Sequence, residues 1–426
     1  SACDHPQESE SPPLPPPCVM ALRAAALRHV RPIGAAAARS SGVRSFSLLA
    51  QLSDADLTED QREFQSLARS FAQNEMAPYA AEWDRTSHFP VPTIKAAAEL
   101  GFGALFAREE FGGTGLKRVD GAVIFEELSA ACPSTTAYLT IHNMCAWMVD
   151  TFGDDHLREK WLPQMASMDK LASYCLTEPG SGSDAAAMST KAVRDGDHYI
   201  VDGSKAFISG GAVSDVYLVM CRAEDGVVCL MIEDGTPGFS FGNNEDKMGW
   251  KCQPTCSLTF EGVRVPVSNR LGGEGDGFKI AMMGLDGGRL SIGACSLGGA
   301  RQCLEIATDY VKEREQFGKP LSHLQSVQFK LADMATELHA SRLLLRHAAS
   351  LLDAKSPAAT MACSMAKRKA TDVGFNVCNE ALQLHGGYGY LNDYPIERFV
   401  RDLRVHQILE GTNEIQRHIV ARTLLA

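Results

Sequence analysis

The sequence predicts an α+β protein that is mostly helical, with its strands gathered in the middle of the chain. Apolar residues recur at helical spacing over 58–173, short β-rich runs separated by Asp-Gly and Pro-Gly turns fill 174–275, and long apolar-periodic stretches return after Gly287. This order of patterns indicates three structural units. The expected domains are a helical domain at 51–173, an antiparallel β domain at 174–282 and a helical bundle at 283–426.

The first 50 residues are expected to form a leader rather than part of the fold. From Met20 to Ser53 the chain carries five arginines, runs of alanine and several serines but no Asp or Glu, which is the composition of a mitochondrial transit peptide. The residues before Met20 are acidic and rich in proline, and they read as an alternative leader or a gene-model artefact. We expect the mature chain to begin near 45–50 and to reside in the mitochondrial matrix.

Composition and charge argue against several functions. Of the 426 residues 45% are hydrophobic, enough for a large core, and the net charge of -11 gives no electrostatic reason to bind nucleic acid. No run reaches the ~18 to 20 apolar residues of a membrane-spanning helix. The 13 cysteines are odd in number and scattered, so we expect reduced thiols. Cys252 and Cys256 lack the further ligands of a zinc site, and no metal is expected.

Helix and strand signals can be placed in order along the chain. Thr58-Glu59-Asp60-Gln61 forms a capping-box pattern before an amphipathic helix that Pro78 closes. The expected strands are 198–201, 215–221, 227–232 and 256–265. The expected helices of the bundle are 292–311, 327–352 and 358–384.

Two short motifs match known sites but lack the flanking structure that those sites need. Gly180 to Ala185 matches the relaxed G-x-G-x-x-A fingerprint of dinucleotide binding, yet the turn at Asp195-Gly196-Asp197 falls where the crossover helix should run. Gly238 to Gly242 matches the G-x-S-x-G elbow of hydrolases, but turn residues flank it on both sides. We interpret Ser240 as an incidental residue of a β segment, with a thioesterase kept as an alternative.

Several separated segments carry residue types that suit a flavin and an acyl thioester. Amides beside glycines can donate to flavin and phosphate oxygens, arginines suit phosphates, and a carboxylate can remove a weakly acidic hydrogen. The segments are Tyr174-Cys175-Leu176-Thr177-Glu178-Pro179-Gly180-Ser181-Gly182-Ser183-Asp184, Lys205-Ala206-Phe207-Ile208-Ser209-Gly210-Gly211, Asp286-Gly287-Gly288-Arg289, Arg314-Glu315-Gln316-Phe317-Gly318 with Leu324-Gln325, Gln383-Leu384-His385-Gly386-Gly387-Tyr388-Gly389 and Leu409-Glu410-Gly411-Thr412-Asn413-Glu414.

In these segments the chain resembles the acyl-CoA dehydrogenases, from about Leu57 to its C-terminus. The resemblance implies a helical N-terminal domain, a middle antiparallel β-barrel, a C-terminal helical bundle and FAD as cofactor. It places the ring of Phe207 beside the flavin and the Ser209 hydroxyl near flavin N(5). Residues implied to contact the cofactor are Tyr174, Cys175, Leu176, Thr177, Glu178, Pro179, Gly180, Ser181, Gly182, Ser183, Phe207, Ile208, Ser209, Arg314, Leu324, Gln325, Gln383, Leu384, His385, Gly386, Gly387, Thr412, Asn413 and Glu414.

The resemblance also implies a substrate site and a second role for the late segments. The segment of Asp286 is similar to the one that opens the helix lining the CoA channel, and those of Arg314 and His385 reach a neighbouring subunit's cofactor in the family. Taken singly, Arg314 and His385 read as an ion pair and a core histidine. Residues implied to contact substrate are Ser183, Asp286, Gly287, Gly288, Arg289 and Arg422.

Glu410 is the expected catalytic base. Some relatives place the base just before the arginine of the channel helix, but that residue is Gly288 here and has no side chain. Glu410 is therefore the only carboxylate at either base position of the family. A bound acyl chain that excludes water would raise its pKa above the usual ~4.3 and make it a stronger base.

The expected reaction is α,β-dehydrogenation of a short branched acyl-CoA, most simply isobutyryl-CoA to methacrylyl-CoA in valine breakdown. The resemblance implies electron-transferring flavoprotein as the electron acceptor and a homotetramer. Two alternatives stay open besides the hydrolase. The enzyme could act on 2-methylbutyryl-CoA or a short straight chain, because one methylene changes binding by only ~1 to 3 kcal/mol. The chain could also be a non-catalytic scaffold that keeps the fold.

Overall fold

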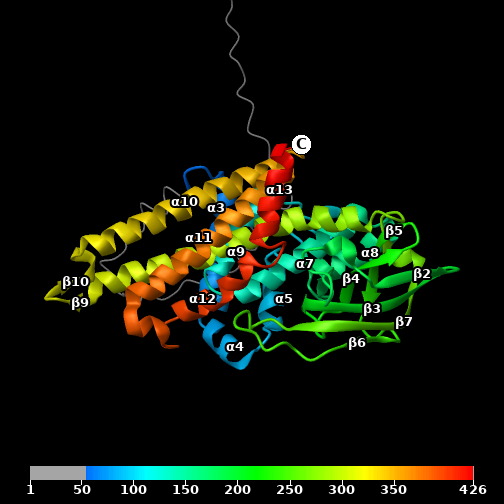
Figure 1. The fold of residues 1–426 in the computed structure, drawn as a ribbon, viewed down its shortest axis with the longest axis horizontal. Helices are drawn as coiled ribbons and strands as arrows, with labels where there is room; N and C mark the ends of the chain where they lie inside the picture. Colours follow the sequence, from blue (N-terminus) through cyan, green and yellow to red (C-terminus); the bar gives the residue numbers. More distant parts are fainter. Residues whose placement is uncertain (1–53, 426) are drawn as a thin grey trace, which may run out of the picture.

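The computed structural model describes residues 54–425, so the predicted leader at 1–50 lies outside the described residues. Figure 1 shows two lobes, a helical lobe with three long helices and a β lobe, with the N-terminal helices packed against both. The arrangement agrees with the predicted α+β class. None of the helices in the described part of the chain is both long and apolar enough to span a bilayer.

The N-terminal helices begin where the sequence predicts. At the start of α3 (Glu59–Phe71) the Thr58 hydroxyl accepts a hydrogen bond from the Gln61 amide, and the Gln61 side chain accepts one from the Thr58 amide, which confirms the capping box. The helix ends at Phe71 and continues as one π-helical turn before Pro78. The remaining helices of this part are α4 (Ala80–Thr86), α5 (Val91–Glu99), α6 (Arg118–Ser129), α7 (Pro133–Phe152) and α8 (Asp155–Ala166).

The middle of the chain forms one sheet with the order β6-β7-β3-β2-β4-β5-β8. The four expected strands are present as β3, β4, β5 and β7, whereas the shorter strands were not predicted. The strands are β1 (Ala172–Cys175), β2 (Lys191–Asp195), β3 (His198–Ser209), β4 (Val216–Ala223), β5 (Gly226–Glu233), β6 (Phe239–Phe241), β7 (Thr255–Pro266) and β8 (Arg270–Leu271).

Two details of the sheet correct the expectation of an antiparallel barrel. Strand β1 lies parallel to β4, and β2 meets β4 in parallel at the single pair Lys191 and Arg222. The terminal strands β6 and β8 do not pair with each other in the part of the chain that the structure describes, so the sheet is not a closed barrel. The physical reason is length, because strands of three and two residues are too short to close a ring of hydrogen bonds.

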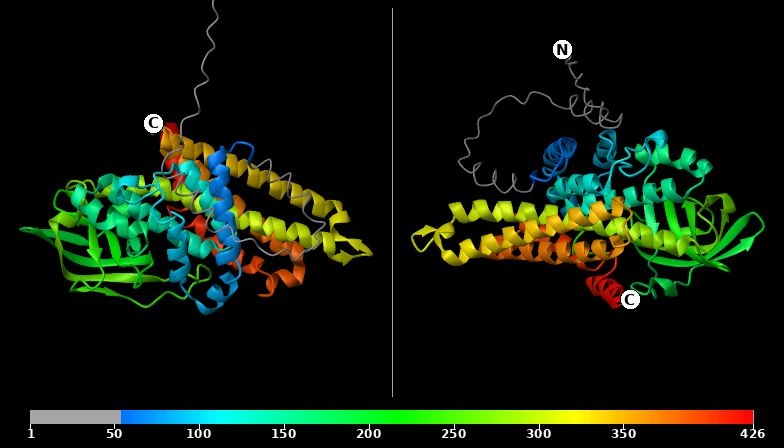
Figure 2. Two further views of the ribbon diagram at one scale, coloured as in Figure 1. Left: turned by 180° about the vertical axis from the view of Figure 1, so that it is seen from behind. Right: turned by 90° about the horizontal axis from the view of Figure 1, so that it is seen from above.

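Three long helices form the bundle and lie side by side in Figures 1 and 2. Helix α9 begins at Gly277, so the segment from Asp286 to Arg289 lies inside it and does not open it as expected. Gly287 and Gly288 make room there for the side chains of Arg118 and Glu410. The C-terminal helices are α9 (Gly277–Glu313), α10 (Gln325–Asp353), α11 (Ala359–His385), α12 (Ile396–Arg404) and α13 (Asn413–Leu425), with a hairpin of β9 (Glu315–Gln316) and β10 (Lys319–Pro320) between α9 and α10.

The two motifs that match a dinucleotide site and a hydrolase elbow both lack the flanking helix that such sites need, as predicted. After Gly180 the chain makes only a three-residue 3-10 turn before β2, and Ser240 lies exposed in β6 with no helix after it. Neither a Rossmann site nor a nucleophile elbow is formed. The cysteines within 54–425 are buried and none is in a disulfide, as the scattered spacing predicted.

Candidate active site

A cavity of about 430 Å³ lies where the β lobe meets the helical lobe. Helices α7, α9 and α13 and strands β1 and β3 contribute to its walls, so residues distant in sequence converge there. The predicted site residues that line it are Tyr174, Leu176, Thr177, Gly182, Ser183, Phe207, Ile208, Ser209, Arg289, Glu410 and Arg422.

The backbone at Glu410 is in the left-handed conformation, with φ 56°, and Gly411 follows with φ 83°. For a residue with a side chain this conformation costs roughly 1–2 kcal/mol, so surrounding contacts must hold it. The Gln416 amide donates to the carbonyls of Glu410 and Gly411 at 3.0 and 2.9 Å. On the other side Lys367 Nζ donates to the Gly411 carbonyl at 2.9 Å. This turn places the Glu410 side chain in the cavity wall.

The Glu410 carboxyl group is poised to exchange a proton near neutral pH. Burial raises its pKa to about 7, while Arg289 and Lys367 lower it by their positive charge. Its Oε2 atom is buried and has no hydrogen-bond partner among residues 54–425. A carboxylate that is both partly desolvated and unpartnered is suited to remove a proton from a bound molecule.

The four residues from Asp286 to Arg289, predicted to contact substrate, lie inside α9 and differ in what surrounds them. Asp286 accepts hydrogen bonds from Arg289 at 2.6 Å and from Thr360 at 2.7 Å, which fixes the arginine at the cavity wall. Gly287 faces the Arg118 guanidinium, and Gly288 faces the Glu410 carboxyl group. Arg289 alone of the four lines the cavity directly.

The loop after β1 is anchored from inside the β lobe. Glu178 is buried, and its carboxylate accepts hydrogen bonds from Lys205 at 2.8 Å and from the Ser189 and Thr190 amides. Burial alone would raise the pKa of Glu178, but these hydrogen bonds outweigh it and hold the pKa at about 2. Cys175 is likewise buried in the sheet. Because the side chains of Cys175 and Glu178 are buried, only their backbone groups can contact a ligand.

Phe207 interrupts β3 with a left-handed backbone, φ 57°, and remains 68% exposed while it lines the cavity. A large apolar side chain held in a strained conformation at a cavity mouth indicates a surface kept for a partner group. Gly180 and Gly182 face open space, since a Cβ atom at either would meet no atom within 4 Å. Pro179 is also exposed, whereas Ser181 is buried and bonds to the Asp184 carbonyl.

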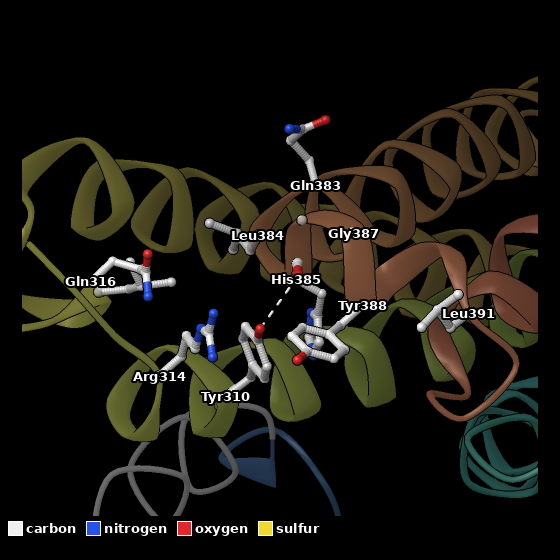
Figure 3. A pocket seen from close by; sticks show the side chains of 11 residues that line it. Tyr310, Arg314, Gln316, Gln383, Leu384, His385, Gly387, Tyr388 and Leu391 are labelled. Atoms are coloured by element: carbon white, nitrogen blue, oxygen red, sulfur yellow. Dashed lines mark hydrogen bonds between the residues drawn. The ribbon is translucent and has the colours of Figure 1, made fainter.

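A second cavity, of about 390 Å³, is lined by Arg314 and by the segment from Gln383 to Gly387, which are predicted to contact the cofactor (Figure 3). Arg314 and Tyr310 lie on one side of it, and the segment from Gln383 to Gly387 lies on the other. His385 is buried and its ring stacks on that of Tyr310 at 4.1 Å, and its Nε2 atom has no hydrogen-bond partner in the described part of the chain. Arg289 and Arg314 are 25 residues apart along α9 and its end, roughly 37 Å at helical rise. The two cavities of one chain are therefore separate.

The remaining predicted residues lie outside the main cavity. Leu324 and Gln325 begin α10 beside the β9–β10 hairpin. Thr412 accepts a hydrogen bond from the Ile415 amide and Glu414 is exposed beside Arg417, so both belong to the first turn of α13. Asn413 is buried and bonds to Lys367, Thr371 and Asp372.

Sequence reasoning missed Lys367 and Gln416, which hold the turn at Glu410. Lys367 stands in the run Ala366-Lys367-Arg368-Lys369, which reads as a solvated helix face. Its spacing carried the missed signal, because Cys363, Lys367, Ala370 and Gly374 fall on one helical stripe, and this stripe is buried. Trp250, which lines the cavity and bonds to the buried His406, gave no sequence signal.

Comparisons with known proteins define the class. Family models for the N-terminal, middle and C-terminal domains of acyl-CoA dehydrogenases match residues 58–169, 173–263 and 275–425. The chain belongs to the acyl-CoA dehydrogenase family and is an oxidoreductase of that family. The resemblance and the fold class predicted from sequence are thereby confirmed.

Particular relatives narrow the comparison. The chain is 57% identical to the mitochondrial isobutyryl-CoA dehydrogenase of Dictyostelium discoideum, over 86% of this chain and 90% of that protein. It is 55% identical to the mitochondrial isobutyryl-CoA dehydrogenase of Bos taurus, over 87% and 90%. Its fold matches the solved butyryl-CoA dehydrogenase of Megasphaera elsdenii with a TM-score of 0.85 at 39% identity, over 87% of this chain and 99% of that one.

Proposed function

We propose that this protein uses FAD to convert isobutyryl-CoA to methacrylyl-CoA, a step of valine breakdown, with Glu410 as the base. The observation that carries the proposal is the Glu410 carboxyl group at the main cavity: burial raises its pKa to about 7, and its Oε2 atom has no hydrogen-bond partner among residues 54–425. The names of the two relatives above 50% identity support the branched substrate.

The residues at the cavity fit a flavin. Gly180 and Gly182 offer backbone amides beside open space, and Thr177 and Ser209 line the cavity with hydroxyl groups. The exposed ring of Phe207 offers a flat apolar face. FAD, when bound, supplies the acceptor for the two electrons and the β-hydrogen of the substrate.

The chain's own groups orient the thioester and remove one proton. Glu410 accepts the proton from the α-carbon, and apolar walls from α7 and α9, including Ile141, Met144 and Ile292, exclude water from the carboxylate. Exclusion of water raises the pKa of the base further and increases its basicity toward the substrate. Arg289, held by Asp286, and Ser183 and Arg422 line the remainder of the substrate path.

The second cavity supports a role between subunits. We infer that Arg314, Leu324, Gln325 and the 383–387 segment contact the distal part of a neighbouring subunit's FAD in a homotetramer. The distance between the two cavities of one chain is the supporting observation. Thr412, Asn413 and Glu414 are proposed as further neighbours of FAD. The proposed domain boundaries are 50/51, 173/174 and 282/283, although 173/174 falls within β1 and 282/283 within α9.

Electron-transferring flavoprotein is the proposed acceptor, and the mitochondrial matrix is the proposed location. The arginine-rich, acid-free composition of 20–53 and the mitochondrial relatives support this location. Residues 1–53 themselves lie outside the described part of the chain.

An anaerobic titration tests the proposed function. The purified protein is expected to show the yellow flavin absorbance and to lose it on addition of isobutyryl-CoA. A panel with 2-methylbutyryl-CoA and butyryl-CoA, read as kcat/KM with an electron-transferring flavoprotein, ranks the acyl chains. A colourless protein would indicate the scaffold alternative, and release of free CoA without an acceptor would indicate the hydrolase. A higher kcat/KM for another acyl chain would overturn isobutyryl-CoA as the substrate.

A further inference from the structure

Lys367 is a buried cation that forms no ion pair within residues 54–425. The residue is 0% exposed, and its Nζ atom donates to the Gly411 carbonyl and to Asn413 Oδ1, each at 2.9 Å. Both acceptors are neutral. Burial of an ammonium group without a carboxylate partner is costly, so a neutral residue of similar size would be the more stable choice for structure alone.

The position of Lys367 relates it to the base. The Gly411 carbonyl belongs to the residue that directly follows Glu410, in the left-handed turn that aims the carboxyl group into the cavity. Asn413, the second acceptor, begins α13 and is fixed in turn by Thr371 and Asp372. The Lys367 ammonium group therefore connects α11 to the turn at Gly411 and to the first residue of α13, Asn413.

Lys367 and Arg289 both act on Glu410 by their positive charge, Arg289 the more strongly, but only Lys367 lacks a carboxylate partner within residues 54–425. Arg289 also lies beside Glu410, but its guanidinium is paired with Asp286 at 2.6 Å. Among the charged groups that act on Lys367, Glu410 has the strongest effect on its pKa. The uncompensated positive charge thus favours the ionised base.

From this geometry we propose that Lys367 is a positioning residue for the reaction, which fixes the Glu410 turn and supplies the positive charge that keeps Glu410 ionised. The inference rests on the proposed function of Glu410 as the base. Other titratable or charged groups that act on or lie near this pair are Arg289 and Asp286 on α9, Cys145 on α7, Tyr174 on β1, Asp372 on α11, His406 before the turn, and Glu414 and His418 on α13.

Burial lowers the pKa of Lys367 to about 7, which Glu410 partly offsets, so the two groups titrate as a coupled pair. Loss of the cation removes a favourable interaction with ionised Glu410 and must raise the pKa of that carboxyl group. Since only the ionised carboxylate accepts a proton, the acid limb of kcat/KM must then move to higher pH.

The first experiment compares pH profiles of kcat/KM in holoenzymes. Lys367→Met and Lys367→Gln are expected to move the acid limb upward by about one pH unit, and Lys367→Arg to leave it within about 0.3 unit. The matched control is Gln416→Leu, which removes hydrogen bonds to the same carbonyls without a change of charge. It is expected to lower kcat but to keep the acid limb in place. An unmoved limb in both neutral variants, or an equal shift in Gln416→Leu, would overturn the proposal.

A second measurement does not depend on turnover or on folding of the neutral variants. In holoenzyme labelled at lysine Cε, Lys367 is identified by comparison with Lys367→Arg, and its NMR titration is followed in wild type and in Glu410→Gln. Removal of the negative charge is expected to lower the pH at which Lys367 titrates. An unchanged titration would overturn the coupling. If no acyl-CoA bleaches the flavin, the proposed function fails while this measurement still decides the coupling of the two residues.

Discussion

A Cβ atom placed on Gly288 would lie 2.6 Å from Oε2 of Glu410. The helix that carries Gly288 therefore leaves room for the Glu410 carboxyl group, the proposed base, at the position where some relatives are expected to carry the base itself. Either residue can bear a side chain there, but the two cannot both occupy the same space. This contact explains why a glycine is kept inside α9, where it weakens the helix.

Gly288→Ala should therefore impair catalysis although it favours the helix. The added methyl group must displace the Glu410 carboxyl group, and we expect kcat/KM to fall by roughly 10²-fold, as for a misplacement of about 1 Å. Gly284→Ala is the matched control, because its Cβ would lie 3.2 Å from the flexible Met148 sulfur and at ordinary contact distances of 3.6 and 3.7 Å from the Met144 side chain. Stopped-flow bleaching and flavin content measure both variants. Wild-type rates in Gly288→Ala would show that Glu410 lies elsewhere during turnover.

Glu410→Gln should keep the flavin and lose the reaction. The amide has the shape of the carboxyl group but cannot accept the α-proton, so the bleaching rate should fall by roughly 10²- to 10⁴-fold. Glu159→Gln on the exposed face of α8 is the control and should react as wild type. Substantial turnover in Glu410→Gln would mean that another residue is the base.

The same substitution should stabilise the protein at alkaline pH. The folded pKa of Glu410 is about 7 against an ordinary 4.5, so the folded state binds this proton more tightly and the wild type loses stability as pH rises from 4.5 to 7. Above pH 7 the cost reaches up to about 3 kcal/mol, which the neutral glutamine avoids. Thermal unfolding should show a higher Tm for Glu410→Gln at pH 8 and a similar Tm at pH 4.5. Equal differences at both pH values would contradict the raised pKa.

Lys205→Met should destabilise the loop after β1 that we propose contacts the cofactor. It leaves the Glu178 carboxylate buried without its cation, which typically costs 3–5 kcal/mol, about the scale of breaking a buried ion pair. The variant should melt earlier and retain less flavin on gel filtration. The double variant Lys205→Met with Glu178→Leu removes both charges and should recover most of the Tm. Loss of flavin without any change in Tm would instead point to a direct contact of Lys205 with the cofactor.

The sequence alone predicted the α+β class, the capping box at Thr58, the family and several residues that line the main cavity, Glu410 among them, because periodic patterns and short motifs carry this information. It did not predict the environment of the base. Lys367 lies in a basic run that resembles a solvated face, and only three-dimensional packing shows that it is buried. The sequence also carried no sign of what Gly287 and Gly288 accommodate, since the Arg118 and Glu410 side chains beside them lie over 120 residues away in the chain.

The separation of the two cavities predicts complementation between inactive chains. Glu410→Gln lacks the proposed base. Arg314→Met should lose flavin, because the second cavity loses its arginine. If each site takes Glu410 from one subunit and Arg314 from a neighbour, tetramers reassembled from an equal mixture should regain about a quarter of the wild-type activity, from sites where both intact residues meet. Each variant alone should stay inactive. If both residues served a cofactor from the same chain, half of the subunits would lack the base and the other half the arginine, and the mixture would gain nothing.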